Sequence, residues 1–493
     1  MRNSALQSTT AMAAERTGTP KVLHWLVAAT FIVILNETIL INALPRLMVA
    51  FDITERTAQW LSTSFMLTMA VVIPTTGWFL QRVTTRIAFG LSMSVFFVGT
   101  LVAALAPTFE ILLAGRIIQA IGTAVMLPLL MTTLMTVVPE RDRGRVMGNV
   151  MLAISVAPAM GPAVSGLILE VGSWRFVFVA VLPIAALITA VGMRYLNNVG
   201  ETGEVPLDKL SVVLAALGFG VLVFGLSEIG APDPFLSPAL TIGFGVLGIG
   251  LFVVRQLSLQ RRSSPLLDLR TLTYRTYALA LVLMVFAFMA MLGAMVLFPL
   301  FLQNVRDLSA LQTGLLMMPG GLAMGLLGPT IGRCFDRFGG RPLVVPGAIG
   351  VLAALVTLTQ VSLVMPMWMI LAVHIVLMVS LACLFTPVFT LGLSAVPQHL
   401  YSHGSSLLAT LQQVAAAMGT AIAMTVLAVR SQALADTGAN DTAAQVGGMQ
   451  WAFGVGAILG VGIVAVSVLM PHRPDGFGAD SVNSPNTQPD AAP

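Results

Sequence analysis

The chain has 493 residues, of which 57% are hydrophobic and only 9% charged, and its formal net charge is +4. Because soluble globular proteins carry about 25% charged residues, this composition excludes an ordinary soluble protein. The two cysteines, Cys334 and Cys383, are too few for a disulfide framework or a metal cage, and we expect both to be free.

Apolar runs of about 20 residues follow one another along the chain, and a helix needs roughly that length to cross the core of a bilayer. Membrane β-barrels alternate apolar and polar residues, whereas these runs are apolar on every side. The sequence therefore predicts an all-α integral membrane protein. In chain order the predicted spans are 23–45, 58–80, 87–106, 110–138, 146–169, 175–196, 210–229, 236–256, 277–302, 312–332, 342–361, 366–396, 405–429 and 449–470.

The basic residues divide unevenly between the two sides of these spans. Of the 25 lysines and arginines, 19 fall on the side of the N-terminus, one (Arg116) lies inside a span, and five lie on the opposite side. Those five are Arg46, Arg56, Arg175, Arg306 and Arg430. Because cytoplasmic loops carry the excess of basic residues, both termini are predicted to be cytoplasmic.

Two segments far apart in the chain repeat one pattern. PTTGWFLQRVTTR from Pro74 and PTIGRCFDRFGGR from Pro329 share the frame P-T-x-G-x-x-x-x-R-x-x-x-R, offset by 255 residues (329 − 74). Parallel repeats are a transporter plan, so two six-helix bundles with two inserted helices between them are predicted. The predicted domains are a cytoplasmic tail (1–22), the first bundle (23–200), the inserted pair with cytoplasmic loops (201–276), the second bundle (277–470) and a disordered cytoplasmic tail (471–493).

Two charged residues are predicted to lie deep in the spans. They are Glu37, in ILNETILINALP at 34–45, and Arg116. A charge at bilayer depth costs several kcal/mol unless it is paired or hydrated. At 1.5 Å per residue, Glu37 lies about 12 Å from Pro45, and Arg116 lies about 9 Å from Glu110. Similar depths make pairing between the two possible, while packing roles for a hydrogen-bonded glutamate and an arginine bound by carbonyls stay open.

At these residues the chain resembles the major facilitator superfamily, and more narrowly its fourteen-span branch of drug:proton antiporters. The C-terminal copy of the repeated loop fits the superfamily's cytoplasmic loop signature. The N-terminal copy has Gln81 where an acid is usual and Thr84–Thr85 in the glycine region. The resemblance implies loops that close the cytoplasmic gate by salt bridges and helix-end contacts. The gating residues implied are Gly77, Arg82, Arg86, Gly332, Asp336, Arg337 and Arg341.

Three further motifs extend the resemblance. LLAGRIIQAIG, with Arg116 and Gln119, resembles the fourth-span motif linked to proton transfer. ILNETILINALP resembles the first-span motif of the branch, in which aspartate is common at the position of Asn36, whereas this chain has Glu37 one residue later. APAMGPAVSG resembles the fifth-span motif that marks antiporters, and small residues there are expected to let a neighbouring helix approach closely. Its members here are Pro158, Gly161, Pro162 and Gly166.

The resemblance implies a proton-coupled efflux transporter in the plasma membrane that exports amphiphilic cationic or neutral drugs by alternating access. Glu37 is then expected to bind the coupling proton beside Arg116. The proton gradient would drive transport without a cofactor or metal, nucleic acid is not an expected partner, and a monomer is expected. The expected polar residues of the substrate cavity, among methionine, phenylalanine and leucine side chains, are Asn36, Asn42, Gln119 and Gln412.

Two alternatives stay open at this point. A proton-coupled carrier for one metabolite would share the architecture, although the fifth-span motif favours exchange. An intramembrane enzyme would need a catalytic or metal constellation at depth, and the only close histidine pair, His399 and His403, is interpreted as a solvated loop pair without an acid or cysteine beside it. The sequence has no phosphate-binding loop of the Walker type, so ATP is not the expected driver.

Overall fold

The computed structural model describes residues 21–199, 203, 206–229, 234–261 and 265–473. Within these residues all regular structure is helical. Fourteen helical segments are long and apolar enough to cross a membrane. This confirms the predicted all-α fold and the predicted number of spans, including the weakly marked pair before residue 260.

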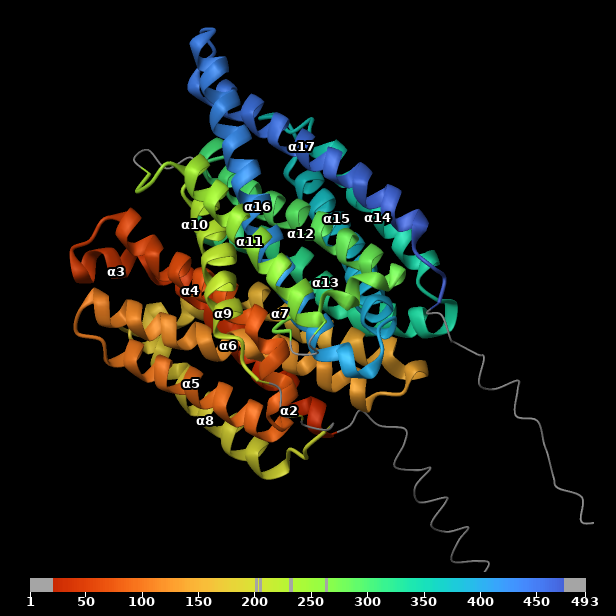
Figure 1. The fold of residues 1–493 in the computed structure, drawn as a ribbon. Coiled ribbons are helices and arrows are strands. Elements are labelled where there is room, and N and C mark those ends of the chain that lie inside the picture. The colour runs from red at the N-terminus through yellow and green to blue at the C-terminus, as the bar shows by residue number, and fades with distance from the viewer. Residues whose placement is uncertain (1–20, 200–202, 204–205, 230–233, 262–264, 474–493) are drawn as a thin grey trace, which may run out of the picture.

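The N-terminal bundle holds six spanning helices and three short helical elements, and Figure 1 shows these helices packed side by side. Apolar residues on all sides make these helices favourable in lipid, where every backbone group must be bonded within the helix. The elements are α2 (Lys21–Ile39), the 3-10 turn η2 (Leu40–Ala43), α3 (Leu44–Phe51), α4 (Glu55–Arg82), α5 (Thr85–Leu105), α6 (Phe109–Val137), η3 (Glu140–Asp142), α7 (Arg143–Val171) and α8 (Phe176–Tyr195).

The inserted pair follows, and its first member is interrupted by a π-helical turn. The pair consists of α9 (Lys209–Ala215), the π turn η4 (Ala216–Gly220), α10 (Val221–Ser227) and α11 (Pro238–Gln260). α10 and α11 pack on each other, η4 packs on α4, and α10 also reaches α16. The pair therefore lies against both halves of the protein, as Figure 1 shows.

The C-terminal bundle repeats the order of the first. Its elements are η5 (Leu269–Thr273), α12 (Arg275–Leu300), the π turn η6 (Phe301–Val305), α13 (Ala310–Phe338), α14 (Arg341–Leu358), α15 (Met367–Ser394), η7 (Gln398–Leu400), α16 (Tyr401–Asp436) and α17 (Asp441–Leu469). In this order α12 corresponds to α2, α13 to α4, α15 to α6 and α16 to α7.

Some of the predicted boundaries are wrong. The first span was expected to run to Pro45, but α2 ends at Ile39, two residues after Glu37, and Pro45 lies in the first turn of α3. Proline lacks the N–H that a continuing helix needs and is favoured at a helix start. The last two spans are longer than expected, because α16 runs on to Asp436 and α17 begins at Asp441. Figure 1 shows the outer part of α16 projecting beyond the bundle.

The two bundles meet along two pairs of helices. α7 packs on α13, which is the most extensive contact between any two helices, and α4 packs on α16. Both pairs reach the end of the molecule that carries the α4–α5 and α13–α14 turns, which we call the basic end. The other end is called the opposite end. The repeat seen in the sequence therefore corresponds to two related contacts between the halves.

Candidate functional site

Arg116 lies at the centre of a hydrogen-bonded network in the N-terminal bundle. Its side chain is 1% exposed. Its Nη1 donates to Asn36 Oδ1 of α2 at 3.2 Å and to Gln119 Oε1 of α6 at 2.9 Å. Gln119 in turn donates to Thr100 Oγ1 of α5 at 2.8 Å. The guanidinium also lies over the Phe65 ring of α4, 4.2 Å from its centroid. The network thus joins four helices around one buried charge.

Glu37 follows Asn36 and is half-buried. Among the described residues no ion pair joins its carboxylate to Arg116, although the two groups are close enough to interact electrostatically. One residue along a helix turns a side chain by about 100°. Asn36, at the position where the branch commonly has aspartate, therefore takes the hydrogen bond to Arg116. Of the possibilities that the sequence left open, a direct ion pair between Glu37 and Arg116 is not formed in this conformation.

Two donors of the network have no hydrogen-bond partner among the described residues. They are Arg116 Nε and Asn36 Nδ2, and both atoms are buried. Buried donors are nearly always satisfied in folded proteins, so an unpaired pair of donors is a place where an acceptor can bind. The only carboxylate beside this place along α2 is that of Glu37.

The fifth-span motif places α7 against the helix that carries Glu37. A Cβ added at Gly161 would overlap Thr38 Oγ1 of α2, so only glycine allows this approach. At Gly166, by contrast, an added Cβ would meet nothing within 4 Å. The expectation of a close approach is therefore wrong at Gly166. Pro158 is half-buried in α7, and the side chain of Pro162 lies outside the described part.

At the basic end, Asp336 joins α13 to α7. Its Oδ1 accepts the N–H of Gly144 at 2.8 Å, and its Oδ2 accepts the N–H of Arg145 at 2.7 Å. These are the second and third residues of α7, whose N–H groups have no partner inside the helix. A negative charge is favourable at this end of the helix dipole. Gly332, one turn earlier, lies against the Gly144 carbonyl, so the two backbones are in direct contact.

The N-terminal copy of the loop makes a different contact. Gln81 Nε2 donates to the carbonyl of His399 at 3.3 Å. Asp336, at the equivalent place of the C-terminal copy, instead accepts hydrogen bonds from the start of a helix. Thr84 accepts the N–H of Ile87 and caps α5, whereas the C-terminal copy turns through Gly339 with φ +78°, a conformation that favours glycine. In the first copy the turn passes through Thr84, whose backbone is extended, so this turn does not require glycine.

The remaining gating candidates lie at the same end. Arg82 lies over the Trp78 ring and Arg337 over the Phe338 ring, with 5.8 and 5.1 Å to the centroids. The Arg86 backbone N–H binds Asn198 Oδ1, and Arg341 begins α14.

Gly77 of α4 lies against His403 of α16, with 2.9 Å between an added Cβ and Nδ1. His403 is 3% exposed inside α16. The prediction of a solvated loop pair is thus wrong for this residue, because α16 begins at Tyr401 and packs on α4. His399 is exposed, as expected.

The sequence did not indicate the role of Arg143, which was counted only as a basic loop residue. Arg143 is 6% exposed at the start of α7. It donates to Ser394 Oγ and Tyr401 Oη of the other half, both at 3.1 Å, and to the Met135 carbonyl at 3.0 Å. It also pairs with Glu140 at 3.5 Å. Arg143 therefore binds both halves at the basic end.

Hydroxyl groups complete the contact between the halves. Thr132 Oγ1 and Ser405 Oγ lie 2.7 Å apart, and Ser406 Oγ donates to the Ile73 carbonyl at 2.7 Å. Gln412, further along α16, is buried, and its Nε2 has no partner among the described residues. The side chain of Asn42, another expected cavity residue, lies outside the described part.

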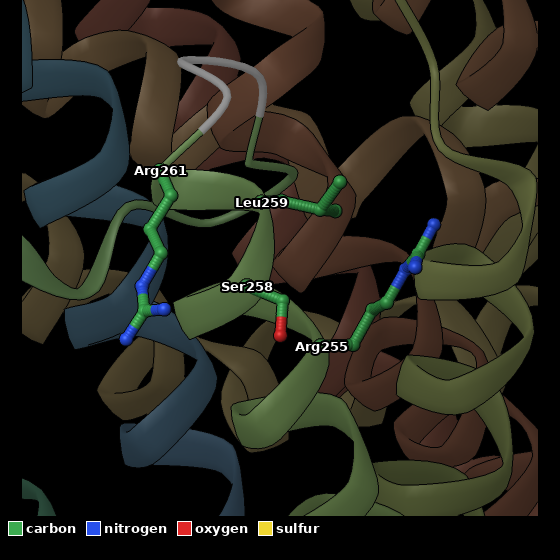
Figure 2. A pocket seen from close by; sticks show the side chains of 4 residues that line it. All are labelled: Arg255, Ser258, Leu259 and Arg261. Carbon is green, nitrogen blue, oxygen red and sulfur yellow. The ribbon is translucent and has the colours of Figure 1, made fainter.

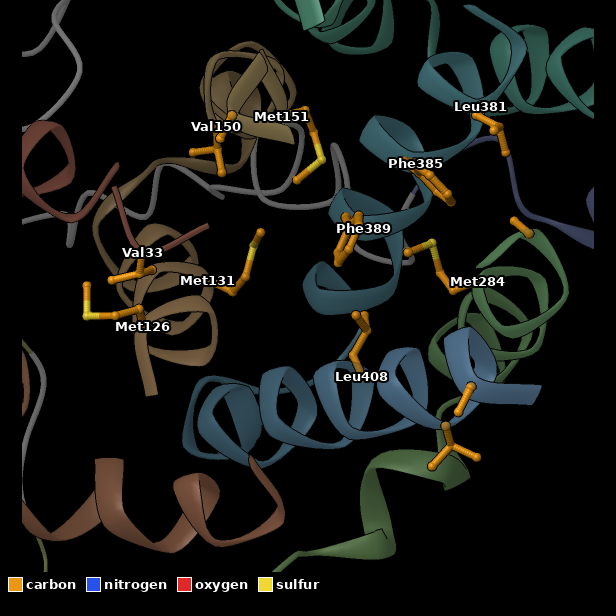
Figure 3. Close-up of a cluster of buried hydrophobic side chains, with 14 of the residues drawn as sticks. Val33, Met126, Met131, Val150, Met151, Met284, Leu381, Phe385, Phe389 and Leu408 are labelled. Carbon is orange, nitrogen blue, oxygen red and sulfur yellow. The ribbon is translucent and has the colours of Figure 1, made fainter. Parts of the chain in front are cut away.

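Both halves also contribute buried apolar side chains to one hydrophobic cluster. Figure 3 shows Met131 and Met151 from the first bundle and Phe385 and Phe389 from the second. Phe385 also stacks on Phe288 with centroids 4.8 Å apart. Methionine adapts to irregular shapes, so this composition suits contact with varied apolar ligands.

A surface hollow of about 240 Å³ lies at the end of α11 and is lined by Arg255, Ser258, Leu259 and Arg261. Figure 2 shows the two arginines pointing away from one another. Arg255 is bound to Asp208 by two hydrogen bonds, of 3.0 and 2.9 Å. The hollow is therefore not a convergent site, and it lies apart from the Arg116 network.

Comparison with known proteins agrees with this architecture. The profile of the Major Facilitator Superfamily matches residues 26–420. The chain is 39% identical over 419 residues to the lincomycin resistance protein LmrB of Listeria monocytogenes, which covers 85% of this chain and 88% of the relative. It is 29% identical over 409 residues to the putative multidrug resistance protein MdtD of Escherichia fergusonii, which covers 81% and 84%.

Two solved structures share the fold. The human organic anion transporter MFSD10 has a TM-score of 0.64 at 15% identity and covers 91% of this chain and 100% of its own. The proton:xylose symporter XylE has a TM-score of 0.60 at 15% identity and covers 90% and 95%.

These matches and the repeated bundles are those of multi-pass membrane transporters. The chain belongs to the major facilitator superfamily, and its fourteen spans and its relatives agree with the drug:proton branch.

Proposed function

We propose that this protein is a drug:proton antiporter that exports amphiphilic cationic or neutral compounds across the plasma membrane by alternating access, with both termini in the cytoplasm. Relatives that cover most of the chain are named for resistance to lincomycin and to multiple drugs, which supports this substrate class. The apolar side chains between the halves are suited to amphiphilic compounds.

The observation that carries the proposal is the Arg116 network beside Glu37. A carboxylate at bilayer depth needs a compensating positive charge or a proton. Arg116 is held by Asn36 and Gln119, and its Nε has no hydrogen-bond partner within the described part of the chain. The ionised Glu37 can be stabilised there or by a cationic substrate, whereas the protonated form needs neither. Proton and substrate are then alternative ways to satisfy one group, which is what exchange requires.

The contacts at the basic end supply the second requirement, a gate that opens and closes. Asp336 and Arg143 both bind across the halves, and both contacts must break when the cytoplasmic side opens. Hydrogen bonds that involve a charged group contribute about 1.5–3 kcal/mol each. The summed free energy of a few such bonds is comparable with the difference in binding free energy that lets a ligand shift the equilibrium between two conformations.

Exchange can be tested with purified protein in proteoliposomes under an imposed pH gradient, with ethidium as the cationic probe and chloramphenicol as the neutral one. We expect the parent to move the probes only when the gradient is present. Glu37→Gln should lose gradient-driven exchange, while Glu170→Gln, at an exposed glutamate near the end of α7, should behave like the parent. Gradient-driven movement that is unchanged in Glu37→Gln would contradict the proposal. Transport of a single metabolite and neither probe would favour the metabolite carrier instead.

A further inference from the structure

The repeat places a histidine in the second bundle where the first bundle has Arg116. α6 begins at Phe109 and α15 at Met367, so Arg116 and His374 both stand seven residues after the helix start (116 − 109 and 374 − 367). The segments LAGRI (113–117) and LAVHI (371–375) share three identities around these residues. α15 corresponds to α6 in the order of the two bundles, so the two residues occupy equivalent places.

The surroundings of His374 also parallel those of Arg116. Its side chain is 4% exposed, and its ring meets the Phe298 ring of α12 edge-on with centroids 4.9 Å apart. Gly320 of α13 makes the room for it, since a Cβ there would lie 2.6 Å from Nε2. Each half thus encloses a nitrogen-bearing side chain at the equivalent place of its fourth span, and the aromatic ring beside it comes from α4 in the first half and from α12 in the second.

The hydrogen bonds of His374 determine its tautomer. Nε2 lies 3.2 Å from the Met317 carbonyl, which can only accept, so Nε2 carries the hydrogen. Nδ1 is buried and has no partner among the described residues. In the neutral ring Nδ1 is a bare acceptor. Protonation would turn it into a donor that needs an acceptor, and this packing does not provide one.

No charged group competes for this place in the described part of the chain. The charged and titratable residues of the helices that pack on α15 lie near helix ends, and none of them interacts electrostatically with His374. They are Arg275 and Tyr277 of α12, Arg333, Cys334, Asp336 and Arg337 of α13, Arg341 of α14, Arg143, Arg145 and Glu170 of α7, and Tyr401, His403, Arg430 and Asp436 of α16.

We propose that His374 is a second proton-binding site, which takes a proton on Nδ1 when the outer part of α13 shifts relative to α15. The step forms one N–H bond with a proton from water and converts the neutral imidazole into a cation. α13 contacts the His374 ring through Met317 and Gly320, and the same helix carries Asp336. A shift of α13 therefore affects both the Asp336 contact of the gate and the protonation of His374. The part of this inference that concerns coupling rests on the proposed antiport, while proton binding itself does not.

The test is nitrogen NMR of the full chain in detergent with ¹⁵N-labelled histidine, titrated between pH 8 and pH 5. The His374 signals are assigned by their loss in His374→Gln, which keeps an N–H donor for the Met317 carbonyl but cannot bind a proton. We expect His374 to pass from the neutral Nε2–H form to the doubly protonated form, and to do so at higher pH in Asp336→Asn, where the gate is weakened. A ring that stays neutral to pH 5 in both proteins would overturn the proposal.

A second measurement relates the site to exchange. In proteoliposomes the ratio of protons to ethidium is obtained from the pH gradient at which net movement stops. The ratio should fall by one in His374→Gln and stay unchanged in His399→Gln, and an unchanged ratio in His374→Gln would overturn the role in coupling. If no exchange occurs in the parent, the antiport proposal fails, and the NMR titration still decides whether His374 binds a proton.

Discussion

Arg116 donates a hydrogen bond of 3.2 Å to Asn36, the residue directly before Glu37. This bond fixes the rotation of α2 relative to α6. Glu37 is the next residue along α2, so its side chain leaves the helix about 100° away from that of Asn36 and its carboxyl does not bind the guanidinium. The acid is therefore close to the buried charge without being bound to it. Such an arrangement allows the carboxyl group to lose or gain a proton without breaking the network that positions it.

The contact between α7 and α2 offers a matched pair of substitutions. Gly161→Ala places a methyl group against Thr38, next to Glu37, and overpacking of this kind costs about 1–3 kcal/mol. Gly166→Ala meets open space, and alanine is the better helix former. We expect Gly161→Ala to lose most ethidium exchange and to melt at a lower temperature, and Gly166→Ala to resemble the parent in both assays. Equal behaviour of the two variants would show that this contact has no role.

The gate can be tested at Asp336. Asp336→Asn removes the charge and one of the two acceptors at the start of α7. With about 1.5 kcal/mol lost from bonds to a charged group, the equilibrium should shift about tenfold towards the state open at the basic end. We expect slower exchange with normal amounts of protein in the membrane. Asp307→Asn, at an exposed acid of the opposite end, is the control, and parent-like turnover in Asp336→Asn would assign the loop a topological role alone.

The sequence was sufficient for the architecture because each span is long, apolar and separated by basic or turn residues. The repeat was visible because both loop copies need proline, glycine and arginine at fixed places. Asp336 could also be selected, since it is the one acid in the two copies. These features depend on local sequence and on the bilayer, so a single chain reveals them.

The details of the site depend on packing between distant segments and could not be predicted. The rotation of α2 decides that Asn36 rather than Glu37 meets Arg116. Burial of His403 follows from the position of α4 against α16, and the contacts of Arg143 span more than 250 residues, as its bond to Tyr401 shows. Arg143 does follow a helix-breaking proline at a helix start, but the same pattern describes many exposed loop arginines.

The inserted pair is held by an ion pair that predicts a pH dependence. Asp208 accepts two hydrogen bonds from Arg255, which lowers the pKa of this carboxyl to about 2, against a smaller opposing effect of burial. A lowered pKa in the folded state gives stability that is present above the ordinary value of 3.8 and is lost as the pH falls through about 2.

Asp208→Asn keeps a good helix cap but loses the ion pair, which for partly exposed partners contributes about 1 kcal/mol. We expect a lower melting temperature, by about 1–2 °C, with the same difference at pH 5 and at pH 8. Arg255→Gln should give a similar decrease, because it removes the same ion pair. A difference that disappears between pH 8 and pH 5 would contradict the assignment.

The orientation that the basic residues predict can be measured directly. Residue 264 lies outside the described part, between α11 and η5 along the chain, in a loop that the basic residues predict to be cytoplasmic. In a background without Cys334 and Cys383, a cysteine at position 264 should resist a membrane-impermeant maleimide added to intact cells. A cysteine at position 437, in the exposed turn after α16, should react. The opposite result would place the basic end outside.

The central claim is that Glu37 carries the exchanged proton, and proton release on substrate binding tests it most directly. Purified protein in detergent is mixed with ethidium in weakly buffered solution that contains a pH indicator. The parent and Glu170→Gln should release protons when ethidium binds, and Glu37→Gln, which cannot ionise at this position, should release fewer protons per bound ethidium. Proton release from Glu37→Gln equal to that of the parent would contradict the account and place the coupling group elsewhere.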